Sequence, residues 1–239
     1  MNLPGPEDYI DIHTHDEAPS GPGIFSVISL MAHEPDRPEN IKSVAYTIGI
    51  HPWFLTESSH DLQIAEVIEA AIDPSVIAIG EAGFDRLKGP SPDLQRRTFE
   101  EQVSVAEEHN KPVVIHCVRA WDELLQAHKR LKPAKPWLVH GFRGNKDLAA
   151  QLISKNMFLS FWFDFIIRPE ATKLIKGLPA DRIFLETDGS GVDIKDIYRK
   201  VSTDLEVTVD KLKEIIYKNF IEYFNLKIIN HGVTWDFTE

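Results

Sequence analysis

Short hydrophobic runs recur along the chain, and most of them end at a polar residue. Eight runs rich in Val, Ile, Leu and aromatic residues predict strands at 9–12, 24–30, 44–49, 76–80, 113–115, 137–139, 157–161 and 183–185. Several of these runs are hydrophobic at nearly every position. This pattern is typical of parallel strands that are covered by helices, rather than of half-exposed antiparallel strands.

Segments with helical spacing separate the later strands. They cover 62–71, 92–110, 121–131, 146–155 and 169–176, and a further helix follows Thr208. Ser91 is placed to cap the helix that starts at Pro92, because serine favours the N-cap and proline the first helical position. Alternation of strands and helices predicts an α/β fold, either a TIM-type (β/α) barrel or an open parallel sheet.

The first third of the chain breaks this alternation. Segments 15–23 and 31–42 each contain two prolines, and neither is long and regular enough for a good crossover helix. A barrel built from this sequence would therefore lack one or two outer helices near the N-terminus. No internal repeat or linker-like stretch is found, which favours a single domain over 1–239.

Composition narrows the classes of partner and compartment. The chain has 26 Lys+Arg against 37 Asp+Glu, a formal charge of −11, which disfavours broad binding to duplex nucleic acid. A short nucleic-acid end approaching metal ions is still allowed. The single cysteine, Cys117, cannot form an intrachain disulfide, which fits a reducing cytoplasm. We expect neither a secretory signal nor a membrane-spanning segment, because no apolar run approaches ~20 residues.

Metal-binding side chains occur where the predicted strands end. His13 and His15 are two positions apart, so both point to the same side of a strand and can hold one ion. Four further residues follow other strands directly or within three positions, namely Glu81, His116, His140 and Asp188. Because the carboxyl ends of all strands open onto one face of a parallel barrel, we expect the six side chains to converge.

Six donors exceed the three or four that one zinc-like ion takes, but they suit two ions that share a carboxylate. Glu81 is the natural bridge, since each of its two oxygens can face a different ion. Abundant imidazole favours zinc, manganese or iron over magnesium, and the sequence leaves one or two divalent ions, magnesium included, open.

The order of these motifs resembles the TatD family of metal-dependent deoxyribonucleases, in the amidohydrolase superfamily. The motifs are Asp-x-His-x-His at 11–15, Gly-Ile-His-Pro at 49–52, Ile-Gly-Glu-Ala-Gly-Phe-Asp at 79–85, Pro-Val-Val-Ile-His at 112–116, His-Gly-Phe-Arg-Gly at 140–144 and Leu-Glu-Thr-Asp at 185–188. The resemblance implies a TIM-type barrel enzyme whose metal-activated water cleaves phosphodiester bonds in DNA, at short or single-stranded ends.

The resemblance also implies roles for single residues. His13, His15 and Asp188 would hold one ion, His116 and His140 the other, and Glu81 would bridge them. Asp188 and Glu81 are accordingly the expected catalytic residues, with Asp188 as the general base. His51 and Arg143 are the expected substrate contacts. A structural capping role is an equal alternative for His51. For Arg143, the equal alternative is an ordinary exposed arginine without a substrate contact. Asp85 either orients a ligand histidine or caps a turn.

Some positions depart from the family pattern. Arg119 stands one residue later than the arginine that the family carries after its fifth strand, which puts that phosphate contact in doubt. Segment 194–205 leads almost directly to the final helix, so the usual substrate loop is expected to be short, and 16–42 matches poorly. A hydrolase of a small-molecule amide or ester with the same metal centre is therefore a competing hypothesis, and a non-catalytic metal-binding module is a third. No obligatory protein partner is evident.

Overall fold

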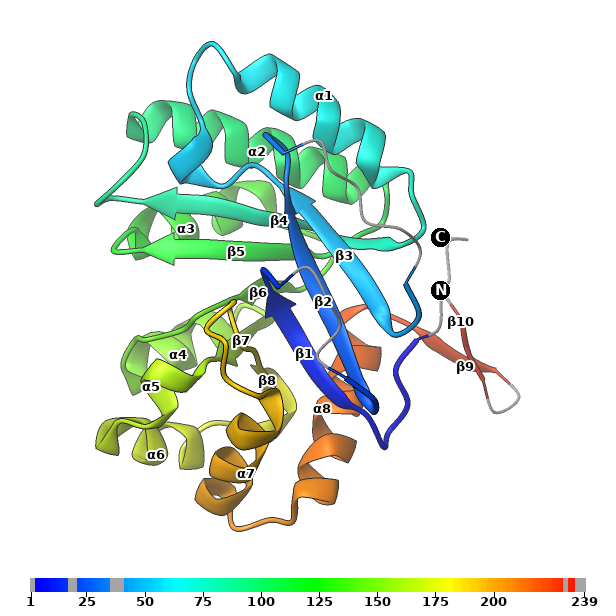
Figure 1. Ribbon diagram of the computed structural model, residues 1–239. Helices are drawn as coiled ribbons and strands as arrows, with labels where there is room; N and C mark the ends of the chain where they lie inside the picture. The colour runs from blue at the N-terminus through cyan, green and yellow to red at the C-terminus, as the bar shows by residue number, and fades with distance from the viewer. Residues whose placement is uncertain (1–2, 17–20, 35–40, 230–231, 235–239) are drawn as a thin grey trace. The chain divides into compact units, whose positions relative to one another are not determined.

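A computed structural model describes residues 3–16, 21–34, 41–229 and 232–234. Before a terminal hairpin, these residues form eight strands, and from the third strand onward the strands alternate with helices (Figure 1). They are β1 (Tyr9–Thr14), β2 (Ile24–Met31), β3 (Val44–Gly49), β4 (Val76–Asp85), β5 (Val113–Val118), β6 (Trp137–Val139), β7 (Met157–Phe161) and β8 (Ile183–Leu185). All eight predicted runs are strands.

The helices follow the predicted pattern with one correction. They are α1 (His60–Ala71), α2 (Pro92–Glu108), α3 (Trp121–Leu131), α4 (Lys146–Ile153), α5 (Phe163–Ile166), α6 (Pro169–Lys176), α7 (Ile194–Leu205) and α8 (Val209–Tyr223), with 3-10 turns η1 (Pro52–Phe54) and η2 (Ala180–Arg182) and a terminal hairpin of β9 (Lys227–Ile229) and β10 (Gly232–Thr234). Residues 194–205, for which no helix was predicted, form the helix α7. Asp193 caps it, and Ile194, Ile197 and Val201 bury one helical face.

The predicted gap in the outer helices is confirmed for the residues that the structure describes. None of them forms a helix between β1 and β2 or between β2 and β3. Residues 17–20 and 35–40, within the poorly matching segment 16–42, lie outside the described residues. None of the helices described is long and apolar enough to span a bilayer.

The chain divides into two compact units. The first unit comprises Met1–Ile28, Ile41–Val44 and Gly141–Glu239, and the second comprises Ser29–Asn40 and Ala45–His140. The single domain over 1–239 stays a prediction.

The second unit is built on strands β3, β4, β5 and β6, which pair in parallel in that order. Helix α2 packs its apolar face, which includes Phe99, against this sheet. The Phe99 ring meets Phe84 of β4 at 4.8 Å and Trp137 of β6 at 5.4 Å between centroids. Ser91 caps the helix as expected, because its hydroxyl accepts a hydrogen bond from the Leu94 N–H.

Close contact between β4 and β5 depends on a glycine. Gly83 of β4 pairs with His116 of β5, and a Cβ at position 83 would lie 2.0 Å from the His116 carbonyl oxygen. Its φ of +153° is also one that other residues rarely adopt. The absence of a side chain therefore lets β5 place His116 beside the end of β4.

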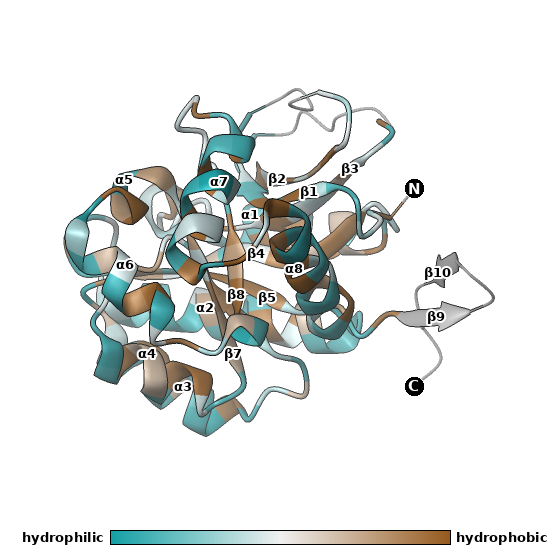
Figure 2. Cartoon of the chain, turned by 90° about the horizontal axis from the view of Figure 1, so that it is seen from below, coloured by the Kyte–Doolittle hydropathy of each residue, from teal (hydrophilic) through white to brown (hydrophobic). Residues whose placement is uncertain are grey.

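The first unit contains two parallel strand pairs, β1 with the start of β2 and β7 with β8. Helices α7 and α8 pack on β1. The Tyr198 hydroxyl bonds both the N–H and the carbonyl of Ile10 at 3.0 and 3.1 Å, and Phe220 contacts Phe25 at 5.6 Å between ring centroids. Figure 2 shows hydrophilic and hydrophobic residues on different sides of α8. The hydrophobic side of this helix is therefore a core face.

Candidate metal centre

The six predicted metal ligands fall into two clusters of three, one in each unit. His13, His15 and Asp188 form the first cluster, and Glu81, His116 and His140 belong to the second. His51, predicted as a substrate contact, also lies in the second cluster.

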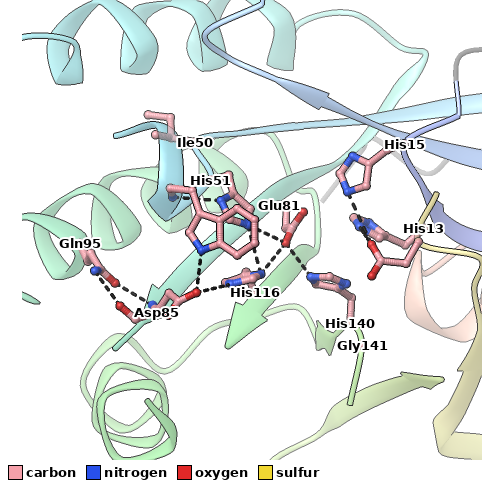
Figure 3. A network of polar contacts seen from close by, with 12 residues as sticks. His13, His15, Ile50, His51, Glu81, Asp85, Gln95, His116, His140 and Gly141 are labelled. Carbon is pink, nitrogen blue, oxygen red and sulfur yellow. Dashed lines mark hydrogen bonds and ion pairs between the residues drawn. The ribbon is translucent and has the colours of Figure 1, made fainter. Parts of the chain in front are cut away.

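Spacing in the first cluster matches that of ligands around one ion. Nε2 of His13 and Nε2 of His15 lie 3.7 and 3.6 Å from Asp188 Oδ1. These separations exceed a normal hydrogen bond. Two ligands ~2.1 Å from one tetrahedral ion stand about 3.4 Å apart, so the three side chains fit a zinc-like ion. Figure 3 shows the His13 and His15 rings side by side at the end of β1.

Backbone contacts place Asp188 beside His13. The Asp188 N–H donates to the His13 carbonyl oxygen at 3.1 Å, and Asp188 takes a left-handed φ of +52°. Such a conformation is uncommon for residues other than glycine, although aspartate tolerates it better than most. The turn after β8 thereby holds the carboxylate against the end of β1.

Asp11 also holds the turn after β8 against β1, a role that was not predicted from the sequence. Its carboxylate accepts hydrogen bonds from the Thr187 N–H at 3.0 Å and the Thr187 hydroxyl at 2.7 Å. Complete burial raises the pKa of Asp11 to about 8, and the Thr187 bonds act in the opposite direction. Its position two residues before His13 in a buried strand was the available signal.

Glu186 is a second functional candidate, and it was not predicted from the sequence. It is buried directly after β8 and accepts hydrogen bonds from the Gly141 N–H at 2.6 Å and the Ser160 hydroxyl at 2.5 Å. Glu186 therefore connects the turn that contains Arg143 with strands β7 and β8.

Arg143 extends from this turn over an aromatic ring. Its guanidinium carbon lies 4.2 Å from the ring centroid of Trp162, and the side chain is exposed. Within the described part of the chain no carboxylate forms an ion pair with Arg143, although Asp188 is close enough to act on it electrostatically. A guanidinium held by its flat face keeps its in-plane N–H groups available to an anion.

The second cluster surrounds one carboxylate oxygen. Oε1 of Glu81 lies 2.6 Å from His116 Nδ1, 2.7 Å from His140 Nε2 and 3.2 Å from His51 Nε2. Figure 3 shows His51, His116 and His140 directed toward Glu81. Two or three imidazoles with one carboxylate form a donor set typical of zinc and manganese sites.

Asp85 makes a contact that each of its two suggested roles requires. Its Oδ2 atom lies 3.3 Å from His116 Nε2, so it can orient that ring, and its Oδ1 atom accepts from the N–H groups of Leu87 and Lys88 at 2.6 and 3.0 Å. Burial raises the pKa of Asp85, but a 2.6 Å bond from the Trp53 indole N–H and the other donors outweigh burial and lower the pKa overall.

His51 acts as a cap, and that contact also sets its tautomer. Its Nδ1 atom accepts a 3.0 Å hydrogen bond from the Trp53 N–H at the start of η1. The neutral ring therefore carries its proton on Nε2, which faces Glu81. Burial lowers the pKa of His51, against the opposing effect of Glu81, which favours this neutral form. The predicted capping role is confirmed, and the substrate contact stays a prediction.

Two neighbours of His116 take no part in the cluster. Cys117 is partly exposed and its pKa is raised by burial, so the thiol is a poor ligand. Arg119 is exposed with a φ of +52°.

Parallel strands that end in clustered histidines and carboxylates define an α/β protein with a candidate site for divalent metal ions. The comparisons then identify the family. Residues 36–225 match the family model of the TatD-related DNases, and the chain belongs to that family.

Relatives share part of their length with this chain. It is 30% identical over 145 residues to the metal-dependent hydrolase YabD of Bacillus subtilis, covering 59% of this chain and 56% of YabD. It is 30% identical over 169 residues to the 3'-5' ssDNA/RNA exonuclease TatD of Shigella flexneri, covering 66% of this chain and 62% of TatD. The chain thus matches roughly three fifths of these curated relatives.

The fold likeness is more extensive. The crystal structure of the TatD homologue YjjV from Escherichia coli superposes with a TM-score of 0.77 at 21% identity, covering 93% of this chain and all of the YjjV chain. This likeness confirms the predicted α/β fold class, the TIM-type barrel of the TatD structures.

Proposed function

We propose that this protein is a divalent-metal-dependent hydrolase that cleaves phosphodiester bonds at the ends of short or single-stranded nucleic acids. The observation that carries the proposal is the first cluster, in which His13, His15 and Asp188 are spaced as ligands of one ion. Family membership and the exonuclease name of the Shigella relative support the phosphodiester substrate.

Each cluster supplies ligands for one ion in this proposal. His13, His15 and Asp188 hold the first ion, and Glu81, His116 and His140 hold the second. Bridging by Glu81, the identity of the metal and a cytoplasmic location stay predictions. When bound, such ions lower the pKa of a coordinated water and neutralise charge on a phosphate.

The remaining roles belong to side chains of this chain. The Asp188 carboxylate takes the proton of the attacking water and returns it to the leaving group. Arg143, with its planar face on Trp162, binds a phosphate oxygen through its in-plane N–H groups. His51 donates a proton or hydrogen bond from Nε2, because its Nδ1 is occupied by the Trp53 N–H.

Metal analysis of the purified protein, followed by cleavage of end-labelled single-stranded DNA on the same sample, tests the proposal. We expect cleavage to require added Mn²⁺ or Zn²⁺, to stop with chelator, and to exceed turnover of amide and ester substrates offered in parallel. Turnover of an amide or ester without cleavage of DNA would favour the small-molecule hydrolase, and bound metal without any turnover would favour a non-catalytic module.

Asp188→Asn is the sharpest variant, since asparagine keeps the shape and tolerates the left-handed backbone but cannot serve as a base. We expect at least a hundredfold loss in kcat. Asp193→Asn is the matched control, because it lies on the same segment and asparagine also caps a helix well. Equal activity of the two variants would contradict the role of Asp188.

A further inference from the structure

Two adjacent aromatic side chains of the second unit are exposed beside its metal-ligand cluster. Trp53 and Phe54 form the end of η1, directly after His51 and Pro52, and their exposed fractions are 42% and 44%. Rings of this size are largely buried in most folded proteins. Two consecutive exposed rings next to a candidate catalytic cluster therefore indicate a surface that meets a ligand.

Trp53 is held in one orientation by the cluster itself. Its indole N–H donates a 2.6 Å hydrogen bond to Asp85 Oδ2, the same oxygen that lies 3.3 Å from His116 Nε2. The ring also makes edge contacts with His51 and His116, at 4.9 and 5.9 Å between centroids. The indole plane is thus fixed relative to a predicted metal ligand before any substrate arrives.

A positive charge accompanies this ring. Lys88 Nζ lies 3.7 Å from the Trp53 ring centroid, and the backbone N–H of Lys88 donates a hydrogen bond to Asp85 Oδ1. No carboxylate among the described residues pairs with the Lys88 ammonium group. An aromatic ring beside a lysine is the combination that single-strand binding sites use, with the ring for a base and the charge for the phosphate.

The Phe54 ring already takes part in a stacked contact within the protein. His33 lies parallel to it, with 4.1 Å between the centroids and 22° between the planes. This geometry is that of a stacked pair.

We propose that Trp53 and Phe54 form a base-stacking surface for a single-stranded nucleic acid, with Lys88 contacting its backbone. The inference rests on the proposed function, because it places the bases next to the phosphate that the Glu81 cluster would act on. The chemistry favours nucleic acid over an apolar peptide, since the surface is two rings wide and carries a cation. Stacking on a ring is tolerant of sequence, so this surface would select single strands without selecting particular bases.

The test compares two oligonucleotides that share their phosphates and differ in their bases. One is a short oligothymidylate, and the other has the same length with abasic sugars near its cleaved end. For Phe54→Ala we expect KM for oligothymidylate to rise about tenfold, with kcat changed less than about twofold and the abasic substrate unaffected. Trp53→Ala should raise KM for oligothymidylate in the same way, and because it also removes the indole bond to Asp85 it is compared with Trp53→Phe, which lacks that bond too. Trp53→Phe and Phe54→Tyr restore a ring and should restore KM.

The rescue variants separate stacking from a structural role. Trp53→Phe lacks the indole N–H, so failure to restore KM would show that the Asp85 bond, and not stacking, matters, and would overturn the proposal. Equal losses on both oligonucleotides, or no loss on either, would also overturn it. Ile72→Ala, which changes an exposed residue at the far end of α1, should leave all parameters unchanged.

Failure of the proposed hydrolase function can be distinguished from failure of the base-stacking surface. If the wild type cleaves neither oligonucleotide with any metal, hydrolysis is refuted, and the stacking surface is still tested by fluorescence anisotropy of the labelled oligonucleotides. We then expect tighter binding of oligothymidylate than of the abasic strand, and loss of the difference in Phe54→Ala. Equal binding of the two strands by the wild type would refute the surface.

Discussion

The Thr187 hydroxyl donates a 2.7 Å hydrogen bond to Asp11, across 176 residues of sequence. Asp11 lies in β1 two residues before His13, and Thr187 directly precedes Asp188 in the turn after β8. One buried bond thus connects the two segments that supply the first cluster, so its loss should affect both stability and metal affinity.

Thr187→Val keeps the side-chain shape but removes this hydroxyl. We expect the free energy of unfolding to fall by about 1–3 kcal/mol, because the Asp11 carboxylate loses a buried donor. Metal affinity should fall roughly 10- to 100-fold, since groups that orient ligands have effects of this size. Urea denaturation and metal titration measure the two effects. Thr203→Val, whose exposed hydroxyl bonds Arg199 within α7, should change neither.

Metal should stabilise the folded chain. An ion that binds the native state at a hundred times its Kd adds about 2.7 kcal/mol, which corresponds to a rise in Tm of roughly 5–10 °C for a chain of this size. Differential scanning fluorimetry with Zn²⁺ or Mn²⁺, with chelator as reference, measures the shift. His13→Ala should lose most of it, whereas His109→Ala, at the end of α2, should retain it. An unchanged shift in His13→Ala would contradict the first cluster as a metal site.

Gly83→Ala should displace His116. The added Cβ would lie 2.0 Å from the His116 carbonyl oxygen, so β5 must move away from β4. Steric overlap together with backbone strain should cost about 3 kcal/mol of the free energy of unfolding. Thermal denaturation and metal titration together check this result. Gly177→Ala is the control, since its nearest neighbours lie at 3.4 Å and the backbone there is helical.

Buried Lys111 should make stability depend on pH above neutrality. Its ammonium donates to the carbonyls of Ala71, Asp73 and Val76, and burial lowers its pKa from 10.5 to about 8. Between pH 8 and 10.5 the unfolded chain binds more protons at this site than the folded chain, so the free energy of unfolding rises with pH.

Lys111→Met isolates this dependence. We expect wild-type stability, measured relative to the variant by urea denaturation, to increase between pH 7.5 and pH 9.5. Titrations elsewhere in the chain cancel in this difference. A difference that is constant, or that falls with pH, would show that Lys111 keeps its ordinary pKa in the folded protein.

Most of the fold could be predicted from local patterns. Hydrophobic runs located every strand of the sheet, and Ser91 and Thr208 marked the starts of α2 and α8, because burial and capping are properties of neighbouring residues. The helix over 194–205 was not predicted, although the helical spacing of Ile194, Ile197 and Val201 is present in the sequence.

The sequence by itself also determined which residue types stand at the strand ends, and hence the chemistry that is available. Tertiary structure alone decided how they are used: the pairing of Asp11 with Thr187, the tautomer of His51 set by Trp53, and the fixing of an exposed indole by Asp85. The first and third of these relationships join residues 176 and 32 positions apart, and the second depends on the local conformation at the start of η1. The sequence identifies which residues can donate, but only the packing of the folded chain determines which groups they face.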